Sequence, residues 1–158
     1  MKMTVIRQFL QDVEWGDLDY LVVDLPPGTG DEPLSVCQLA TPVDGSVIVT
    51  TPQQVSTADV RRSIRFCQKL EIPVLGVVEN MIGFVCPKCG EITHIFKTGG
   101  GEKMANDVQV PFLGRVPIDA EIGLACDSGT PFVYGDAHTP SNRAFEQIAL
   151  AILSLSNK

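Results

Sequence analysis

Two closely spaced cysteines are the residues of this chain with the clearest potential for chemistry. Cys86 and Cys89 enclose Pro87 and Lys88 and are followed by Gly90, a spacing that lets two thiolates bind one metal. Two sulfurs fill only half of a tetrahedral site, and the sequence contains no second Cys-x-x-Cys pair. A second copy of the chain is the best source of the missing thiolates. The pattern therefore predicts a homodimer that shares either a zinc ion or an iron–sulfur cluster.

The other thiols and the nearest histidine are weaker candidates for metal ligands. Cys37, Cys67 and Cys126 fall within predicted helices, where small buried thiols are common. His94 follows the cysteine pair closely, but we interpret it as a solvated or packed side chain. A thioredoxin-like redox role is not favoured, because the pair lies in a loop and not at the start of a helix that follows a strand.

Asp24 is the second candidate for chemistry. It lies at the end of an apolar run over residues 20–25, and a loop rich in proline and glycine follows. A carboxylate at the C-terminal end of a buried strand holds Mg²⁺ or its water in the Walker B arrangement of nucleotide-binding proteins. The short pattern is common, however, and Asp24 could equally cap a turn before Pro26.

A sheet is needed to position these residues. Four apolar runs predict strands at residues 20–25, 46–50, 74–79 and 112–116. Because the runs are continuously apolar, we expect the strands to be buried on both faces. Helical patterns cover residues 4–13, 31–40, 57–70 and 102–107, and a last helix begins with Thr139 as N-cap and Pro140 at its first position. This alternation predicts a three-layer α/β fold with a mostly parallel sheet flanked by helices.

The chain shows no internal repeat and no linker. We therefore expect residues 1–158 to form a single domain, with a metal-binding insertion around residues 84–97. The net charge of −7 and the scattered basic residues argue against a nucleic-acid partner. No apolar stretch approaches the roughly 20 residues that cross a bilayer, and no secretory signal is present. A cytoplasmic protein with reduced cysteines is the expectation.

Six short strings also occur in an order and spacing that resemble one protein family. They are Asp-Leu-Pro-Pro-Gly-Thr-Gly-Asp at residues 24–31, Val-Thr-Thr-Pro-Gln at 49–53, Val-Glu-Asn-Met at 78–81, Cys-Pro-Lys-Cys-Gly at 86–90, Ile-Phe at 95–96 before the glycines 99–101, and Gly-Arg-Val-Pro-Ile-Asp at 114–119. Together they resemble the Mrp/ApbC family of P-loop ATPases, iron–sulfur carriers related to MinD and to the nitrogenase iron protein.

The resemblance implies a role for each site residue. Asp24 would be the Walker B ligand of Mg²⁺, and Gly28 belongs to the switch-like loop at the nucleotide. Asn80 and the loop from Pro117 to Asp119 would contact adenine. The resemblance also implies that Cys86 and Cys89 hold a [4Fe–4S] cluster between two chains and deliver it to client apoproteins.

One part of the family pattern is missing. Phosphate binding needs a glycine-rich loop with a lysine and a serine or threonine, and the sequence has none; the nearest segment, residues 98–104, has methionine after its lysine. The resemblance implies that the chain matches the C-terminal part of the family's fold and begins after the Walker A region. The strand at residues 20–25 would then lack a neighbour and expose apolar surface. We expect ATP and Mg²⁺ to bind only if this loop is supplied, with little hydrolysis by the chain alone.

Two other functions remain open. The chain could be a dimeric zinc-binding module built on an ATPase remnant, without enzymatic activity. It could also be a MinD/ParA-like positioning ATPase, although that class does not require the cysteine pair and this chain has no basic amphipathic helix. A hydrolase using Asp31 and Glu32 is less favoured, since acidic residues at a helix start usually interact with the helix dipole.

Overall fold

The computed structural model describes residues 2–86, 88–135 and 139–156. Its elements follow one another as α1 (Lys2–Gln11), α2 (Asp31–Leu39), β1 (Ser46–Thr50), α3 (Gln54–Lys69), β2 (Val74–Val85), β3 (Ile92–Thr93), α4 (Gly100–Asp107), β4 (Phe112–Ile118), α5 (Ala120–Ser128), a 3-10 helix η1 (Phe132–Tyr134) and α6 (Pro140–Ser156).

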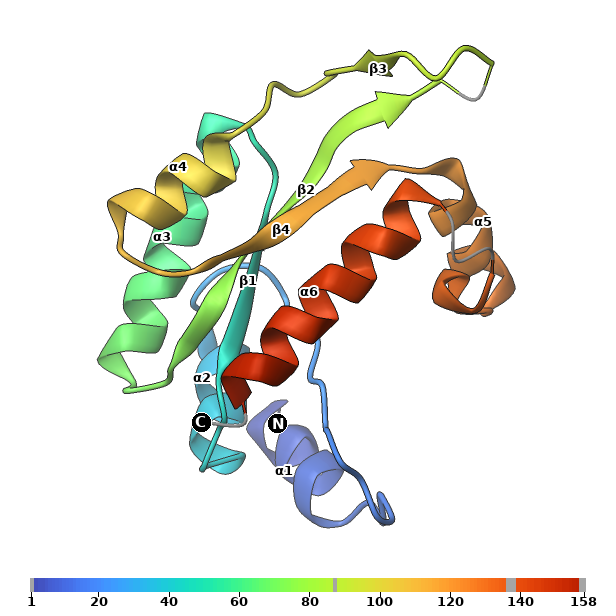
Figure 1. The fold of residues 1–158 in the computed structure, drawn as a ribbon. Coiled ribbons are helices and arrows are strands. Elements are labelled where there is room, and N and C mark those ends of the chain that lie inside the picture. Colours follow the sequence, from blue (N-terminus) through green and yellow to red (C-terminus); the bar gives the residue numbers. More distant parts are fainter. Residues whose placement is uncertain (1, 87, 136–138, 157–158) are drawn as a thin grey trace.

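A twisted sheet forms the middle of the molecule (Figure 1). Its central strand is β2, which pairs in parallel with β1 on one side and with β4 on the other. The two-residue strand β3 pairs antiparallel with the far end of β2, where Phe84 faces Thr93 and Val85 faces Ile92. The predicted mostly parallel sheet is therefore confirmed.

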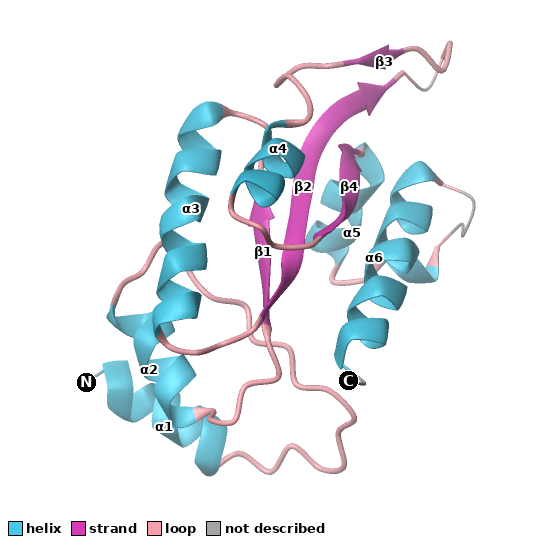
Figure 2. Ribbon diagram, turned by 60° about the vertical axis from the view of Figure 1, so that its left-hand side comes forward, coloured by secondary structure: helices cyan, strands magenta, loops and turns pink. Residues whose placement is uncertain are grey.

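Helices cover both faces of this sheet (Figure 2). Neighbouring residues of a strand point to opposite faces, so Val77 and Val78 of β2 belong to two different cores. On the face covered by α3 and α4, the buried core consists of Ile64, Val77, Met104 and Ala105. On the face covered by α6, it consists of Val78, Val116 and Ile148. Burial on both faces of β2 confirms the predicted three-layer α/β fold.

The predicted start of α6 is confirmed, whereas the predicted start of α3 is wrong. The N–H of Asn142 donates to Thr139 Oγ1 at 3.1 Å, and α6 begins at Pro140, as predicted. Helix α3 begins at Gln54, three residues before the predicted start. The Ser56 hydroxyl lies inside the first turn, where it accepts from the Thr51 N–H at 3.2 Å. It therefore anchors the loop after β1 and does not cap the helix.

The prediction of a strand at residues 20–25 is wrong. The segment between α1 and α2 carries no strand, and its apolar side chains are exposed, with Val22 at 89%. A run of β-forming residues becomes a strand only when a neighbouring strand takes up its backbone hydrogen bonds. Within the described residues β1 pairs with β2 alone, and residues 20–25 pair with neither of them.

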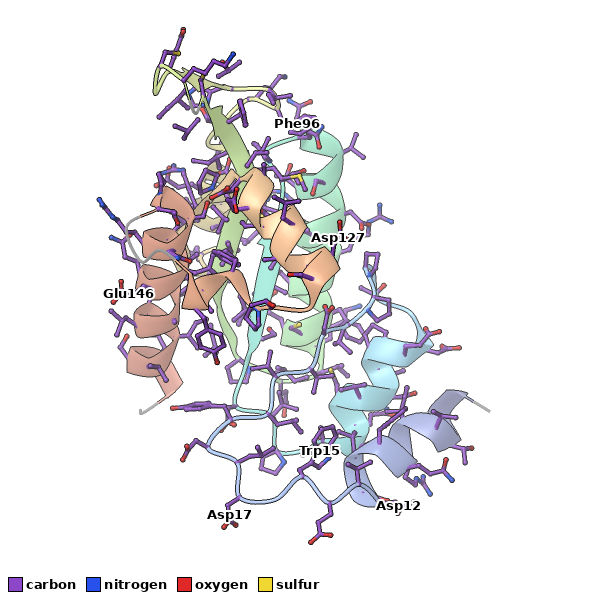
Figure 3. All side chains as sticks on the ribbon, turned by 90° about the vertical axis from the view of Figure 1, so that its right-hand side faces the viewer. Asp12, Trp15, Asp17, Phe96, Asp127 and Glu146 are labelled. Atoms are coloured by element: carbon purple, nitrogen blue, oxygen red, sulfur yellow. The ribbon has the colours of Figure 1, made fainter. Side chains whose placement is uncertain are left out.

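The N-terminal segment lies at the end of the sheet away from β3 (Figures 1 and 3). Helix α1 packs against α2, and Trp15 Nε1 donates to the carbonyl of Phe9 at 3.1 Å. Figure 3 shows Trp15 and Asp17 far from Phe96, which follows β3. None of the described helices is long and apolar enough to cross a membrane.

Candidate functional site

The middle of β2 and the C-terminal end of β4 bring two of the predicted contact segments together. Asn80 of β2 pairs with Val116 of β4, and Pro117 follows Val116 in that strand, which ends at Ile118. Asn80 Oδ1 accepts from the N–H of Met81 at 2.9 Å, which fixes the orientation of the amide. Asn80 and Pro117 are both half-buried. The edge expected to face adenine is therefore formed by these two strands.

The carboxylate of Asp119 is engaged within the chain. Its Oδ1 accepts from the N–H of Glu121 at 3.0 Å, which makes it the N-cap of α5. Its Oδ2 accepts from the Ser141 hydroxyl at 2.7 Å. Each carboxylate oxygen thus already accepts one internal hydrogen bond, so this side chain orders the loop that a nucleotide would contact.

Asp24 and Gly28 are placed differently from the sequence expectation. Asp24 is exposed in the segment without a strand, so it does not occupy the end of a buried strand. Gly28 has a φ of +97°, a conformation that favours glycine, and no atom lies within 4 Å of the position its Cβ would take. The Mg²⁺ and nucleotide roles of these two residues stay predictions.

The cysteine pair lies in a tight loop between β2 and β3. The Cys86 N–H donates to the carbonyl of Glu91 at 2.9 Å, and the Gly90 N–H donates to the carbonyl of Cys86 at 2.8 Å. Gly90 has a φ of +73°, which lets the chain turn back tightly. Pro87 lies outside the described residues. These bonds fold Cys86 and Cys89 onto the same small turn.

The electrostatics of the turn favour a thiolate. Hydrogen bonds from the backbone N–H of Lys88, then from the N–H and the thiol of Cys89, lower the pKa of Cys86. These donors favour negative charge on the Cys86 sulfur. A lowered pKa and two thiols on one tight turn are what a metal thiolate site requires, so the pair fits a metal or a cluster.

One chain offers only these two ligands. Among the residues that the structure describes, no group of three or more His, Cys, Asp or Glu could hold a metal ion. His94 Nδ1 lies 2.9 Å from the Ile82 carbonyl, which can only accept, so Nδ1 carries the proton. Cys37 and Cys67 lie in α2 and α3, where burial and the neighbouring Cys67 raise the pKa of Cys37. Cys126 lies in α5, so all three cysteines fall within helices as predicted, but the Cys126 thiol is exposed and not buried.

Sequence reasoning missed Glu79 as an individual residue. It lies at the edge beside Asn80 with a fully buried side chain. Its Oε1 accepts from the Gly99 N–H at 2.8 Å, and its Oε2 lies 3.7 Å from Arg115 Nε. The available signal was a lone carboxylate at the end of an apolar strand, since glutamate is almost never fully buried without a partner.

Comparison with known proteins gives a family and a near structural relative. A family model described as ParA, NUBPL iron-transfer P-loop NTPase, matches residues 1–153. A nucleotide-binding protein from Archaeoglobus fulgidus, solved in complex with ADP and with Co found by PIXE, is 43% identical with a TM-score of 0.76. The match covers 90% of this chain and 57% of that protein.

More distant structures share the fold. The MinD cell division proteins of Aquifex aeolicus and Pyrococcus furiosus are each 20% identical to this chain, with a TM-score of 0.68. The matches cover 97% and 98% of this chain, and 59% and 57% of those proteins. The chain thus spans less than two thirds of the length of these structures. At this identity the likeness to MinD shows the P-loop NTPase fold alone.

Proposed function

The chain belongs to the NUBPL iron-transfer P-loop NTPase family, and from this premise we propose that it carries iron–sulfur clusters. In this proposal Cys86 and Cys89 of two chains hold one [4Fe–4S] cluster as cargo and release it to client apoproteins. The whole protein would act in the cytoplasm, where thiols stay reduced.

The observation that supports this proposal most directly is the construction of the cysteine turn. Backbone N–H groups of Lys88 and Cys89 stabilise the Cys86 thiolate, as does the Cys89 thiol. A second copy would complete four sulfurs at a two-fold axis, because the described residues contain no third ligand for this site. The site is therefore complete only in a dimer.

Zinc is the second candidate for the same sulfurs. Four thiolates suit a zinc ion as well as an iron–sulfur cluster, and a zinc site would make the dimer a structural module. The iron-transfer family favours iron. Metal analysis after anaerobic purification separates the two candidates.

We further propose a nucleotide site at the edge formed by Asn80, Pro117 and Asp119. The relative from Archaeoglobus fulgidus was solved in complex with ADP, which supports this part of the proposal. The 158 residues contain no glycine-rich loop that ends in Gly-Lys-Ser or Gly-Lys-Thr, since Lys97 before Thr98 follows Phe96. ATP hydrolysis would therefore require such a loop in addition to these residues, with Asp24 and Gly28 as the residues that this segment contributes to the nucleotide site.

The test is reconstitution of the purified chain with iron and sulfide in the absence of oxygen. We expect about four irons per dimer, with the absorption of a [4Fe–4S] cluster. Cys86→Ser/Cys89→Ser should lose the iron and become monomeric. Cys126→Ser is the matched control, because this thiol is exposed in α5 and belongs to no ligand group among the described residues.

The possible results lead to different conclusions. Iron that survives in the Cys86→Ser/Cys89→Ser variant would overturn the proposed cluster site. About one zinc per dimer, with no iron after reconstitution, would establish the structural zinc module instead. Transfer is then measured as activation of a cluster-dependent apoenzyme by the loaded chain, and failure of transfer would contradict a carrier role.

A further inference from the structure

We propose that Glu79 is a positioning residue for the cysteine pair, an inference that rests on the proposed function. It holds the chain segment that returns from the cysteine turn, residues 92–99, here called the return limb. Glu79 lies on the central strand β2, and its carboxylate is inaccessible to solvent. The contact that it makes lies twenty residues further along the chain, at the end of this limb.

The return limb is attached to β2 at three levels. Phe84 pairs with Thr93 near the cysteines, and His94 Nδ1 donates to the Ile82 carbonyl at 2.9 Å. At the base, the Gly99 N–H donates to Glu79 Oε1 at 2.8 Å. The upper two attachments are exposed to water, whereas the lowest is part-buried and ends on the fully buried Glu79 carboxylate. The Glu79 bond should therefore contribute most to holding the limb, since charged acceptors form the stronger hydrogen bonds.

The backbone is closely packed directly after the base of the limb. Gly99 has a φ of +78°, and a Cβ on Gly100 would collide with the Pro52 carbonyl. A Cβ on Gly101 would approach the Glu79 side chain within 3.1 Å. Gly100 and Gly101 thus let the backbone approach Pro52 after β1 and Glu79 of β2 closely. A shift of the Glu79 carboxylate would move Gly99 and with it the limb above.

Arg115 connects this attachment with the candidate nucleotide edge. Its Nε lies 3.7 Å from Glu79 Oε2, and its guanidinium forms an ion pair with the exposed carboxylate of Glu102. Glu79 Oε2 itself accepts no hydrogen bond within the described residues. Arg115 precedes Val116, which pairs with Asn80, so it joins the return limb to the strand end that leads to Pro117. The cysteine turn and the edge are therefore held by one buried carboxylate.

The experiment compares Glu79→Gln, Arg115→Met and the double variant. Glutamine keeps an oxygen that can accept from Gly99, but its NH₂ group would face the arginine. The double variant removes both charges and this clash. Two quantities are measured: Co²⁺ affinity at the cysteines without oxygen, and amide hydrogen exchange of residues 92–99 in the metal-free chain. Arg61→Met is the matched control, because it breaks the exposed 2.5 Å ion pair of Asp107 at the other end of α4.

We expect Glu79→Gln to weaken Co²⁺ binding about tenfold, at the lower end of the losses seen when groups that orient metal ligands are replaced. Exchange over the return limb should accelerate by a similar, roughly tenfold, factor. The double variant should recover part of both losses, because the glutamine oxygen can then accept from the Gly99 N–H undisturbed, but as a neutral acceptor it forms a weaker bond than the carboxylate. Arg61→Met should change neither quantity.

Three results would overturn the proposal or its premise. A lower melting temperature in Glu79→Gln with unchanged Co²⁺ affinity and unchanged exchange would leave Glu79 a purely structural residue. If Glu79→Gln does not fold, Arg115→Met takes its place, since it leaves the buried Glu79 carboxylate without its cation and should weaken both quantities. Unchanged affinity and exchange in Arg115→Met then overturn the inference. Equal Co²⁺ binding by the wild type and by Cys86→Ser/Cys89→Ser overturns the metal site, whereas the exchange measurement still decides whether Glu79 holds the limb.

Discussion

Ser141, fully buried in the first turn of α6, donates a hydrogen bond to Asp119 Oδ2 at 2.7 Å. The other oxygen of the same carboxylate caps α5 through the Glu121 N–H. Asp119 follows β4 directly, so one side chain joins the end of the strand beside β2 to the first turns of two helices. This arrangement orders the candidate nucleotide edge before any ligand binds.

Replacement of Ser141 by alanine should therefore destabilise the fold. The change leaves Asp119 Oδ2 without its buried donor, and we expect a loss of about 1–3 kcal/mol in the free energy of unfolding. Ser154→Ala is the matched control, since this exposed hydroxyl of the same helix bonds only to the Ala151 carbonyl; it should cost less than about 0.5 kcal/mol. Urea denaturation followed by circular dichroism measures both, and equal losses would contradict the role of the Asp119 bond.

Replacement by alanine should change the stability of the chain in opposite directions at two glycines. A Cβ on Gly100 would collide with the Pro52 carbonyl, so Gly100→Ala must displace backbone and should cost about 1–3 kcal/mol. Gly123 lies inside α5 with open space around the position of its Cβ. Gly123→Ala should stabilise the chain by about 0.5–1 kcal/mol, because alanine loses less backbone entropy in a helix. Thermal unfolding of the pair checks the prediction, and a stabilising Gly100→Ala would refute the close approach.

The sequence predicted best what depends on near neighbours. Helix α6 starts at Pro140, and Thr139 caps it by accepting a hydrogen bond from the Asn142 N–H. This local interaction can be predicted from the residue types alone. The paired apolar faces of β2 are likewise visible in the continuous run around Val77 and Val78. The cysteine turn was also found, because its spacing is itself the chemical signal.

What the sequence could not supply were interactions between distant residues. The partners of Glu79 and Ser141 lie twenty and twenty-two positions away, and no local pattern identifies them. Strand β2 continues past its predicted end at Glu79 to Val85, because β3 and β4 pair with its extension. The apolar run at residues 20–25 gave a strand preference without a partner strand, and preference alone does not form a strand.

Val22 and Val77 allow the exposed segment to be tested with one substitution. Val22 is 89% exposed whereas Val77 is completely buried. Val77→Ala should cost about 2 kcal/mol through lost burial and the cavity it leaves, whereas Val22→Ala should change stability by less than about 0.5 kcal/mol. Chemical denaturation of both variants measures the difference. A large loss in Val22→Ala would mean that residues 20–25 are buried in a strand after all.

The last prediction uses two half-buried thiols, Cys86 and Cys37, whose pKa values shift in opposite directions. Backbone N–H groups lower the pKa of Cys86, whereas burial and then Cys67 raise that of Cys37. Because the thiolate is the reactive form, Cys86 should reach its full alkylation rate at a lower pH than an ordinary cysteine, and Cys37 at a higher pH.

Iodoacetamide labelling of the metal-free chain across neutral to alkaline pH, with each site quantified by mass spectrometry, measures this difference. At neutral pH Cys86 should react faster than Cys37, and Co²⁺ should protect Cys86 but not Cys37. Identical pH profiles for the two thiols would contradict the stabilisation of the Cys86 thiolate by the turn. Equal protection by Co²⁺ would instead show that the metal does not select the cysteine turn, and the proposed cluster site would lose its chemical basis.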